Sequence, residues 1–134
     1  MNILLDTHIA VWAITDDTRL SMRAREIILD PDNSIYINAV STLEINNKRK
    51  SKKNNLEFTT DEFIENCESA GYIQLPLQSQ HLKVENTLRW GGSGEEHKDP
   101  YDRLLLAQAK AENLCLMTHD AMICLFDEKC ILEV

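Results

Sequence analysis

Four acidic residues occupy positions from which their carboxylates can do chemistry together. Asp6 and Asp120 each follow a short apolar run, whereas Glu44 and Asp102 each lie near the start of a predicted helix. Carboxylates within a few ångström of one another repel, which raises their pKa values. A hard cation such as Mg²⁺ removes that conflict, because it prefers carboxylate oxygen and water as ligands. The pattern therefore favours a carboxylate-held metal, whose characteristic chemistry is phosphodiester hydrolysis.

Each of these acids also has a purely structural explanation. Asp6 can simply be the first residue of the turn after a strand. Its position at a strand end, next to a residue with a hydroxyl group, favours a role in a functional site. Asp120 can cap the segment Ala121–Phe126, and function is favoured over that explanation by a smaller margin. Glu44 matches an S-x-x-E capping box with Ser41, and the residues alone support both explanations equally.

Asp99 and Asp102 lie three residues apart and have different expected roles. Asp99 precedes Pro100, and an N-cap residue is often followed by proline at the first helical position. Asp99 is therefore predicted to cap the helix. Asp102 lies within the first turn, where the helix dipole favours its ionised form, and it is the predicted ligand.

The elements that position these acids follow from the hydrophobic pattern. Strands separated by helices imply βαβ units, and hence a mainly parallel sheet with helices on both faces. Ligands bind beyond the carboxyl ends of such strands, where Asp6 and Asp120 are expected to emerge. The expected strands are Asn2–Leu5, Ser34–Asn38, Tyr72–Leu75, Leu114–Met117 and an edge strand at Cys130–Val134; the expected helices are His8–Ile14, Ser21–Leu29, one that Ser41 opens, one that Thr59 opens, Ser79–Leu88 and Asp102–Asn113.

The whole chain, residues 1–134, has the size and composition of a single domain. It is 43% hydrophobic and 27% charged, which suits one buried core. No stretch approaches the ~20 apolar residues of a membrane helix, and the N-terminus lacks the features of a signal peptide. The four cysteines form no C-x-x-C pair, so free thiols in a reducing compartment, and hence a cytoplasmic protein, are expected.

Four short segments, in order along the chain, match the motifs of a known family. They are Leu4–His8, Ser41–Ile45 followed by Lys48, His97–Leu105, and Thr118–Asp120. Together they resemble the motifs of PIN-domain ribonucleases, and most closely those of VapC-type toxins of bacterial toxin–antitoxin pairs. One such match alone is weak, but four in order across nearly the whole chain are specific.

The resemblance implies a PIN-like three-layer α/β/α sandwich with a central, mainly parallel sheet. It implies an endoribonuclease that uses Mg²⁺, or alternatively Mn²⁺, and an acidic quartet of Asp6, Glu44, Asp102 and Asp120. Asp6 and Asp102 would be the principal metal ligands, and Asp120 and Glu44 would complete the site directly or through water. RNA as substrate, a cognate antitoxin protein over the active-site groove and a homodimer are the partners it implies.

Three residues depart from the family pattern. Leu43 stands where the family usually has Trp, and Lys98 and His119 stand where it usually has Arg. The segment Trp90–Glu96 is also longer than the loop that is usual in the family. None of these differences removes a carboxylate, so they bear on the choice of substrate and not on catalysis.

A basic run after Glu44 is the expected contact for RNA. The net charge of −8 argues against nucleic acid binding when taken alone, but it does not say where the charges lie. On a helix, Lys48 and Lys52 share one face, and Arg49 lies on the next. The run predicts either a track for RNA phosphates or a solvated helix end that complements the dipole, and both readings are equally supported.

Two other functions are compatible with parts of the pattern. A phosphatase of the D-x-D type requires a second aspartate two residues after Asp6, and His8 stands there instead. A catalytically silent PIN-like protein-binding module is the remaining alternative. Such a module is expected to have lost one of the acids, and this chain retains all four.

Overall fold

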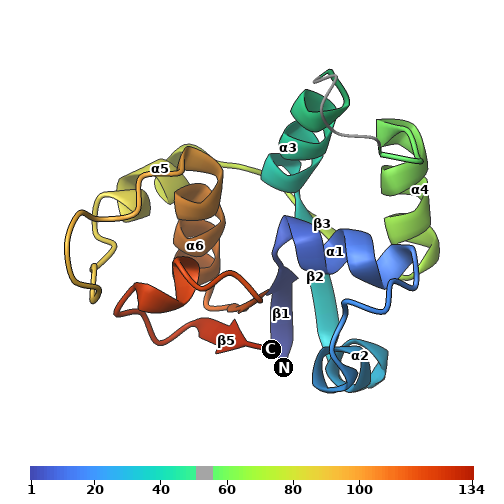
Figure 1. The fold of residues 1–134 in the computed structure, drawn as a ribbon, viewed down its shortest axis with the longest axis horizontal. Coiled ribbons are helices and arrows are strands. Elements are labelled where there is room, and N and C mark those ends of the chain that lie inside the picture. The colour runs from blue at the N-terminus through green and yellow to red at the C-terminus, as the bar shows by residue number, and fades with distance from the viewer. Residues whose placement is uncertain (51–55) are drawn as a thin grey trace.

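A five-stranded, all-parallel sheet forms the centre of the protein in the computed structural model, which describes residues 1–50 and 56–134 (Figure 1). The strand order is β3-β2-β1-β4-β5, so β1 is central and β5 is an edge strand, as expected. The residue that follows β1, Asp6, therefore lies at the middle of the carboxyl edge. The strands are β1 (Asn2–Leu5), β2 (Ser34–Asn38), β3 (Ile73–Leu75), β4 (Cys115–Thr118) and β5 (Ile131–Glu133).

Helices connect these strands close to where the hydrophobic pattern predicts them. Besides the start of α3, two boundaries differ notably from the prediction: α5 ends at Glu85 instead of Leu88, and α6 begins at Pro100 instead of Asp102. No helix in the described ranges is long and apolar enough to cross a membrane. The helices are α1 (Thr7–Ile14), α2 (Met22–Leu29), α3 (Ala39–Lys50), α4 (Thr60–Ser69), α5 (Ser79–Glu85), α6 (Pro100–Glu112) and the short 3₁₀ helix η1 (Ile123–Leu125).

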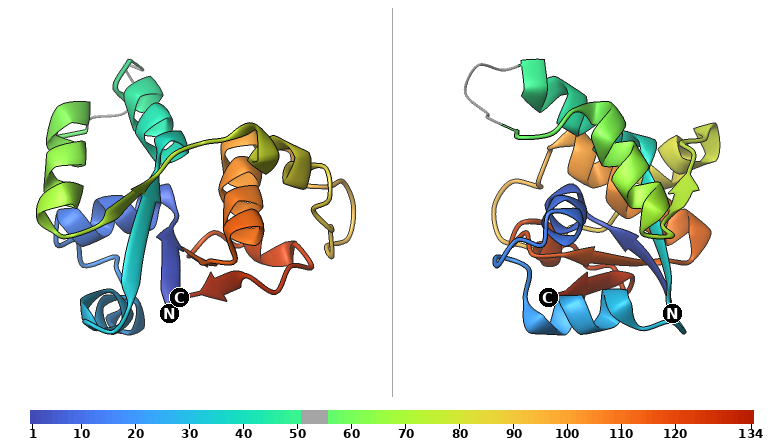
Figure 2. Two further views of the ribbon diagram at one scale, coloured as in Figure 1. Left: turned by 180° about the vertical axis from the view of Figure 1, so that it is seen from behind. Right: turned by 90° about the vertical axis from the view of Figure 1, so that its right-hand side faces the viewer.

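The sheet lies between two layers of helices, which gives the expected three-layer arrangement (Figures 1 and 2). Alternation along the central strand supplies both layers, because Ile3 and Leu5 point to one face and Leu4 to the other. Helices α1, α2 and α4 cover the first face, and Phe63 of α4 is fully buried there. Helix α6 covers the second face through Leu105 and other apolar residues. The near-continuous apolar sequence of β1 follows from this burial on both sides.

The start of α3 differs from the prediction that Ser41 opens it. The helix begins at Ala39, directly after β2. Asn38 is fully buried, and its Oδ1 accepts the backbone N–H of Ser41 over 2.8 Å, which is the bond that an N-cap residue makes. The structure therefore excludes the capping box of Ser41 and Glu44, which was one of the two explanations open for Glu44, because a buried asparagine at the strand end already caps the helix. The prediction that Thr59 opens a helix is confirmed, since Thr59 is the N-cap of α4 and forms a capping box with Glu62.

The segment between α5 and α6 is held against η1. Gly91 donates its backbone N–H to the carbonyl of Leu125 over 3.0 Å, and the ring of Trp90 packs edge-on against Phe126 at 5.0 Å. A Cβ atom on Gly92 would lie 2.5 Å from the Trp90 ring. Close packing therefore explains these glycines. The Trp90 ring is likewise part of this packing.

Candidate active site

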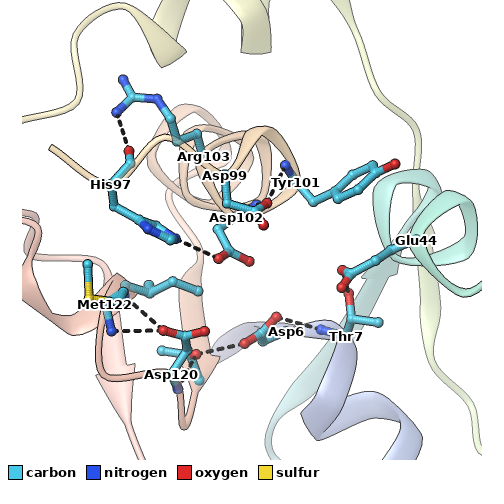
Figure 3. Close-up of polar contacts among 12 residues, drawn as sticks. Asp6, Thr7, Glu44, His97, Asp99, Tyr101, Asp102, Arg103, Asp120 and Met122 are labelled. Carbon is cyan, nitrogen blue, oxygen red and sulfur yellow. Dashed lines mark hydrogen bonds and ion pairs between the residues drawn. The ribbon is translucent and has the colours of Figure 1, made fainter. Parts of the chain in front are cut away.

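Asp6 sits at the end of the central strand and is held by hydrogen bonds on both carboxylate oxygens. Oδ1 accepts the backbone N–H of Thr7, and Oδ2 accepts the hydroxyl of Thr118, each over 2.7 Å (Figure 3). The residue is 4% exposed. Burial raises the pKa of Asp6; these two hydrogen bonds and His8 lower it, and Glu44 raises it further. The hydrogen bonds therefore fix the orientation of the Asp6 carboxylate, while burial still disfavours its ionised form.

Asp102 enters the site from the first turn of α6. Asp99 caps that helix as predicted, because its Oδ1 accepts the N–H groups of Tyr101 and Asp102 over 2.9 and 3.1 Å. Nε2 of His97 donates to Oδ2 of Asp102 over 2.8 Å (Figure 3). Burial raises the pKa of Asp102 to about 6: the His97 hydrogen bond lowers it, whereas the charges of Asp99, Asp6 and Asp120 raise it.

Asp120 follows β4 and caps the next turn, which is the structural role that its sequence position allowed. Its Oδ1 accepts the N–H groups of Met122 and Ile123 over 2.8 and 3.3 Å (Figure 3). The cap uses Oδ1 alone. Since the charge of Asp120 also acts on Asp102, capping and a role in the acidic site are compatible for this residue.

Glu44 approaches from α3 and is joined to the first helix after β1. Thr7 donates its hydroxyl to Oε1 of Glu44 over 2.8 Å, and the Nζ of Lys48 lies 3.2 Å from Oε2. The hydroxyl of Ser41 lies 2.9 Å from that of Thr7. Thr7 therefore connects Asp6, through its backbone, with Glu44, through its side chain.

The structure places all four predicted acids at the carboxyl edge of the sheet. Asp6, Asp102 and Asp120 turn toward a common space, and Glu44 lies beside it (Figure 3). Within residues 1–50 and 56–134, no three His, Cys, Asp or Glu side chains are arranged to hold a metal ion by themselves. An all-oxygen donor set with raised carboxyl pKa values nevertheless fits a hard cation such as Mg²⁺, which binds through one or two carboxylates and keeps several waters.

The predicted RNA contacts differ in where they point. Lys48 lies at the rim of the site, with Nζ 3.2 Å from Glu44 Oε2 and 3.3 Å from Nε2 of His8. Arg49 turns away and donates to the backbone carbonyl of Phe58. Lys52 lies outside the described residues. Of the described members of this group, Lys48 is thus the one placed beside the acidic residues.

Several residues of the site were not assigned a role from the sequence. Thr7 and Thr118 hold Asp6, His97 holds Asp102, and Arg103 holds the backbone of His97. Thr7 and Thr118 each adjoin a strand end, which is a signal that the sequence offers. The partners of His97 and Arg103 depend on the path of the preceding loop, for which the sequence offers no comparable signal.

A family model described as the PIN domain matches residues 3–129. No curated protein matches the chain. A chain in the structure of VapBC2 from Rickettsia felis, bound to a DNA fragment from its promoter, is 19% identical, with 100% of this chain and 99% of that chain covered and a TM-score of 0.68.

Two further solved structures share the fold. A chain of VapBC-1 from nontypeable Haemophilus influenzae is 17% identical, with 92% and 90% of the two chains covered and a TM-score of 0.59. A chain of FitAB bound to an IR36 DNA fragment is 17% identical, with 98% and 94% covered and a TM-score of 0.58. At such identities the structural likeness shows the fold, and the match to the family model shows the family. The chain belongs to the PIN-domain family.

Proposed function

We propose that this protein is a Mg²⁺- or Mn²⁺-dependent endoribonuclease and the toxin of a toxin–antitoxin pair. PIN domains are generally nucleases, and this chain keeps all four acids of the family pattern. One observation carries the proposal. Asp6, Asp102 and Asp120 come from three different segments of the chain and turn toward one space. Burial raises the pKa values of Asp6 and Asp102, and the nearby acids, among them Asp6 and Asp120, raise that of Asp102 further.

The residues of the site have distinct roles in this proposal. Asp6 and Asp102 would be the principal ligands of the cation, with Asp120 joining them directly or through water. Thr118 and Thr7 keep the Asp6 carboxylate oriented, which leaves less conformational freedom to lose on binding. A bound divalent cation supplies the hydroxide nucleophile and neutralises charge on the phosphate.

Lys48 is the described cation best placed to meet the RNA phosphates. Its bonds to Glu44 and His8 keep the ammonium at the rim of the acidic site. A phosphate backbone needs such a local positive charge, because the net charge of the chain is −8. Arg49 turns away to the backbone carbonyl of Phe58, so the proposed RNA contact rests on Lys48.

An antitoxin protein is the proposed partner. Solved structures that share this fold are of VapBC and FitAB complexes, two of them bound to DNA. We infer that this chain likewise pairs with a protein antitoxin, that it acts in the cytoplasm and that it forms a homodimer. Co-purification of the chain with the product of an adjacent small gene is the direct check on the pairing.

Cleavage of RNA in the presence and absence of metal tests the proposed activity. The purified protein is incubated with total bacterial RNA, tRNA included, in Mg²⁺ or Mn²⁺, with single-stranded DNA of matched length in parallel. We expect discrete RNA fragments that disappear when EDTA is added. Intact RNA in both metals would reject the nuclease proposal for these substrates and favour a silent protein-binding module.

A further inference from the structure

Arg103 joins three parts of the chain just behind the acidic site. Its side chain is 16% exposed and lies between α5, α6 and the loop that connects them. Nε donates to the carboxylate of Glu85, and one terminal nitrogen donates to Oε1 of Glu96 over 2.7 Å. A planar guanidinium bonds two carboxylates and a carbonyl at once, which a lysine ammonium cannot reproduce. Arg103 thus fixes the end of the loop relative to both helices.

The same guanidinium holds the backbone of His97. It donates to the carbonyl oxygen of His97 over 3.1 Å (Figure 3). Phe126 supports both residues, because its ring lies 5.6 Å from the Arg103 guanidinium and 6.4 Å from the His97 ring, which it meets edge-on. The backbone and the ring of His97 are therefore both restrained.

His97 in turn restrains the carboxylate of Asp102. Its Nε2 donates to Oδ2 of Asp102 over 2.8 Å. The other carboxylate oxygen, Oδ1, accepts no hydrogen bond from the part of the chain that the structure describes. The imidazole thus occupies one oxygen of the carboxylate and leaves the second available to a cation.

We propose that Arg103 and His97 are a pair of positioning residues that orient Asp102 for a divalent cation. The inference rests on the proposed function, since it takes Asp102 as a metal ligand. Arg103 sets the backbone of His97, and the imidazole sets the plane of the Asp102 carboxylate. Outer hydrogen-bond partners of metal ligands typically change metal affinity by about 10- to 100-fold.

Binding of Mn²⁺ without RNA tests the pair independently of catalysis. Mn²⁺ is titrated calorimetrically into the metal-free full-length protein at pH 7.5. His97→Gln keeps a donor near the position of Nε2, whereas His97→Phe keeps the ring against Phe126 and removes the donor. Arg103→Lys and Arg103→Met remove the set of hydrogen bonds that the guanidinium donates. Arg89→Met is the matched control, because Arg89 pairs with Glu128 and Asp127 instead.

We expect His97→Phe, Arg103→Lys and Arg103→Met to raise the Kd for Mn²⁺ by about 10-fold or more. His97→Gln and Arg89→Met should stay close to the wild-type value. Urea denaturation of every variant separates loss of metal affinity from loss of fold. If Arg103→Met does not fold, the contrast between His97→Gln and His97→Phe decides the question, because both keep Arg103.

The outcomes separate this inference from the proposed function. Wild-type affinity in His97→Phe, together with RNA cleavage by the wild-type protein in Mn²⁺, would overturn the inference and leave the nuclease standing. Equal losses in His97→Gln and His97→Phe would also overturn it, because the hydrogen bond would then not be the cause. A wild-type protein that neither binds Mn²⁺ nor cleaves RNA would overturn both.

Discussion

Thr118 donates its hydroxyl to Oδ2 of Asp6 over 2.7 Å, although the two residues are 112 positions apart in the sequence. The contact exists because β1 and β4 are parallel neighbours whose carboxyl ends meet at the same edge. Thr118 Oγ1 also accepts the backbone N–H of Asp120 over 3.0 Å. One buried hydroxyl thus sets the positions of two of the proposed metal ligands.

Thr118→Val is expected to weaken both the fold and the metal site. The substitution keeps the shape of the side chain but leaves the Asp120 N–H and one oxygen of Asp6 without their partner. A buried polar group without its partner costs about 1–3 kcal/mol of stability, and the Mn²⁺ affinity should fall by about 10-fold or more. Urea denaturation and calorimetry measure the two effects.

Thr87→Val is the matched control for this substitution, since the Thr87 hydroxyl bonds only its own turn at the surface. It should change neither stability nor Mn²⁺ affinity appreciably. Equal behaviour of Thr118→Val and Thr87→Val would contradict the role given to Thr118.

Asn38→Ala is expected to destabilise the protein by about 2–4 kcal/mol. Nδ2 of Asn38 donates to Oε1 of Gln108 over 2.6 Å, and Oδ1 caps α3 at Ser41. Both bonds are buried, and the substitution leaves Oε1 of Gln108 without its donor. The double variant Asn38→Ala/Gln108→Ala should therefore lose less stability in urea than the sum of the single variants, and strict additivity would argue against the coupling.

The stability of the metal-free protein should depend on pH through Asp102. Its pKa is raised from the ordinary 3.8 to about 6, so the folded protein holds this proton more tightly than the unfolded chain does. Stability should then fall as the pH rises from about 4 to about 6, by up to about 3 kcal/mol for this group. The burial of Asp6 acts in the same direction.

Asp102→Asn cannot ionise and should flatten this part of the stability curve. Urea denaturation in EDTA at several pH values between about 4 and 7 gives the comparison. Parallel curves for the wild-type and Asp102→Asn proteins would show that Asp102 does not titrate in this window.

Lys48→Met is expected to weaken RNA binding. It is also expected to make that binding less dependent on the salt concentration. If Lys48 neutralises one phosphate, its loss should reduce the slope of log K against log salt by about 0.7–0.9. Binding of an uncleaved RNA is measured in EDTA over a range of salt concentrations. Lys83→Met, at an exposed position of α5, is the control, and an equal change in both variants would remove Lys48 from the RNA contact.

The hydrophobic pattern predicted most of the fold, because burial on two faces of a parallel sheet produces distinct apolar runs. Asn2–Leu5 and Ser34–Asn38 match their observed strands residue for residue. The start of α3 was predicted wrongly. Local rules favoured Ser41 as the cap, but the tertiary burial of Asn38 gives that residue the role.

The candidate site was predictable where its residues adjoin strand or helix ends. Asp6, Asp102 and Asp120 lie at the predicted edge of the sheet for that reason. Arg103 and His97 could not be found in the same way, because their contacts depend on how the loop before α6 returns to the site. From the residues alone Glu44 suited a capping box and the acidic site equally, and only the structure shows that Thr7 is its partner.

Asp6→Asn tests the central proposal, a carboxylate-held metal that cleaves RNA, most directly. The wild-type protein, Asp6→Asn and the control Asp32→Asn are compared for RNA cleavage in Mn²⁺ and for Mn²⁺ binding. Asp32 is exposed and lies just before the amino end of β2, at the opposite edge of the sheet. We predict that Asp6→Asn folds but loses cleavage by at least about 100-fold, while Asp32→Asn matches the wild type. Equal cleavage by the wild-type and Asp6→Asn proteins would contradict the account.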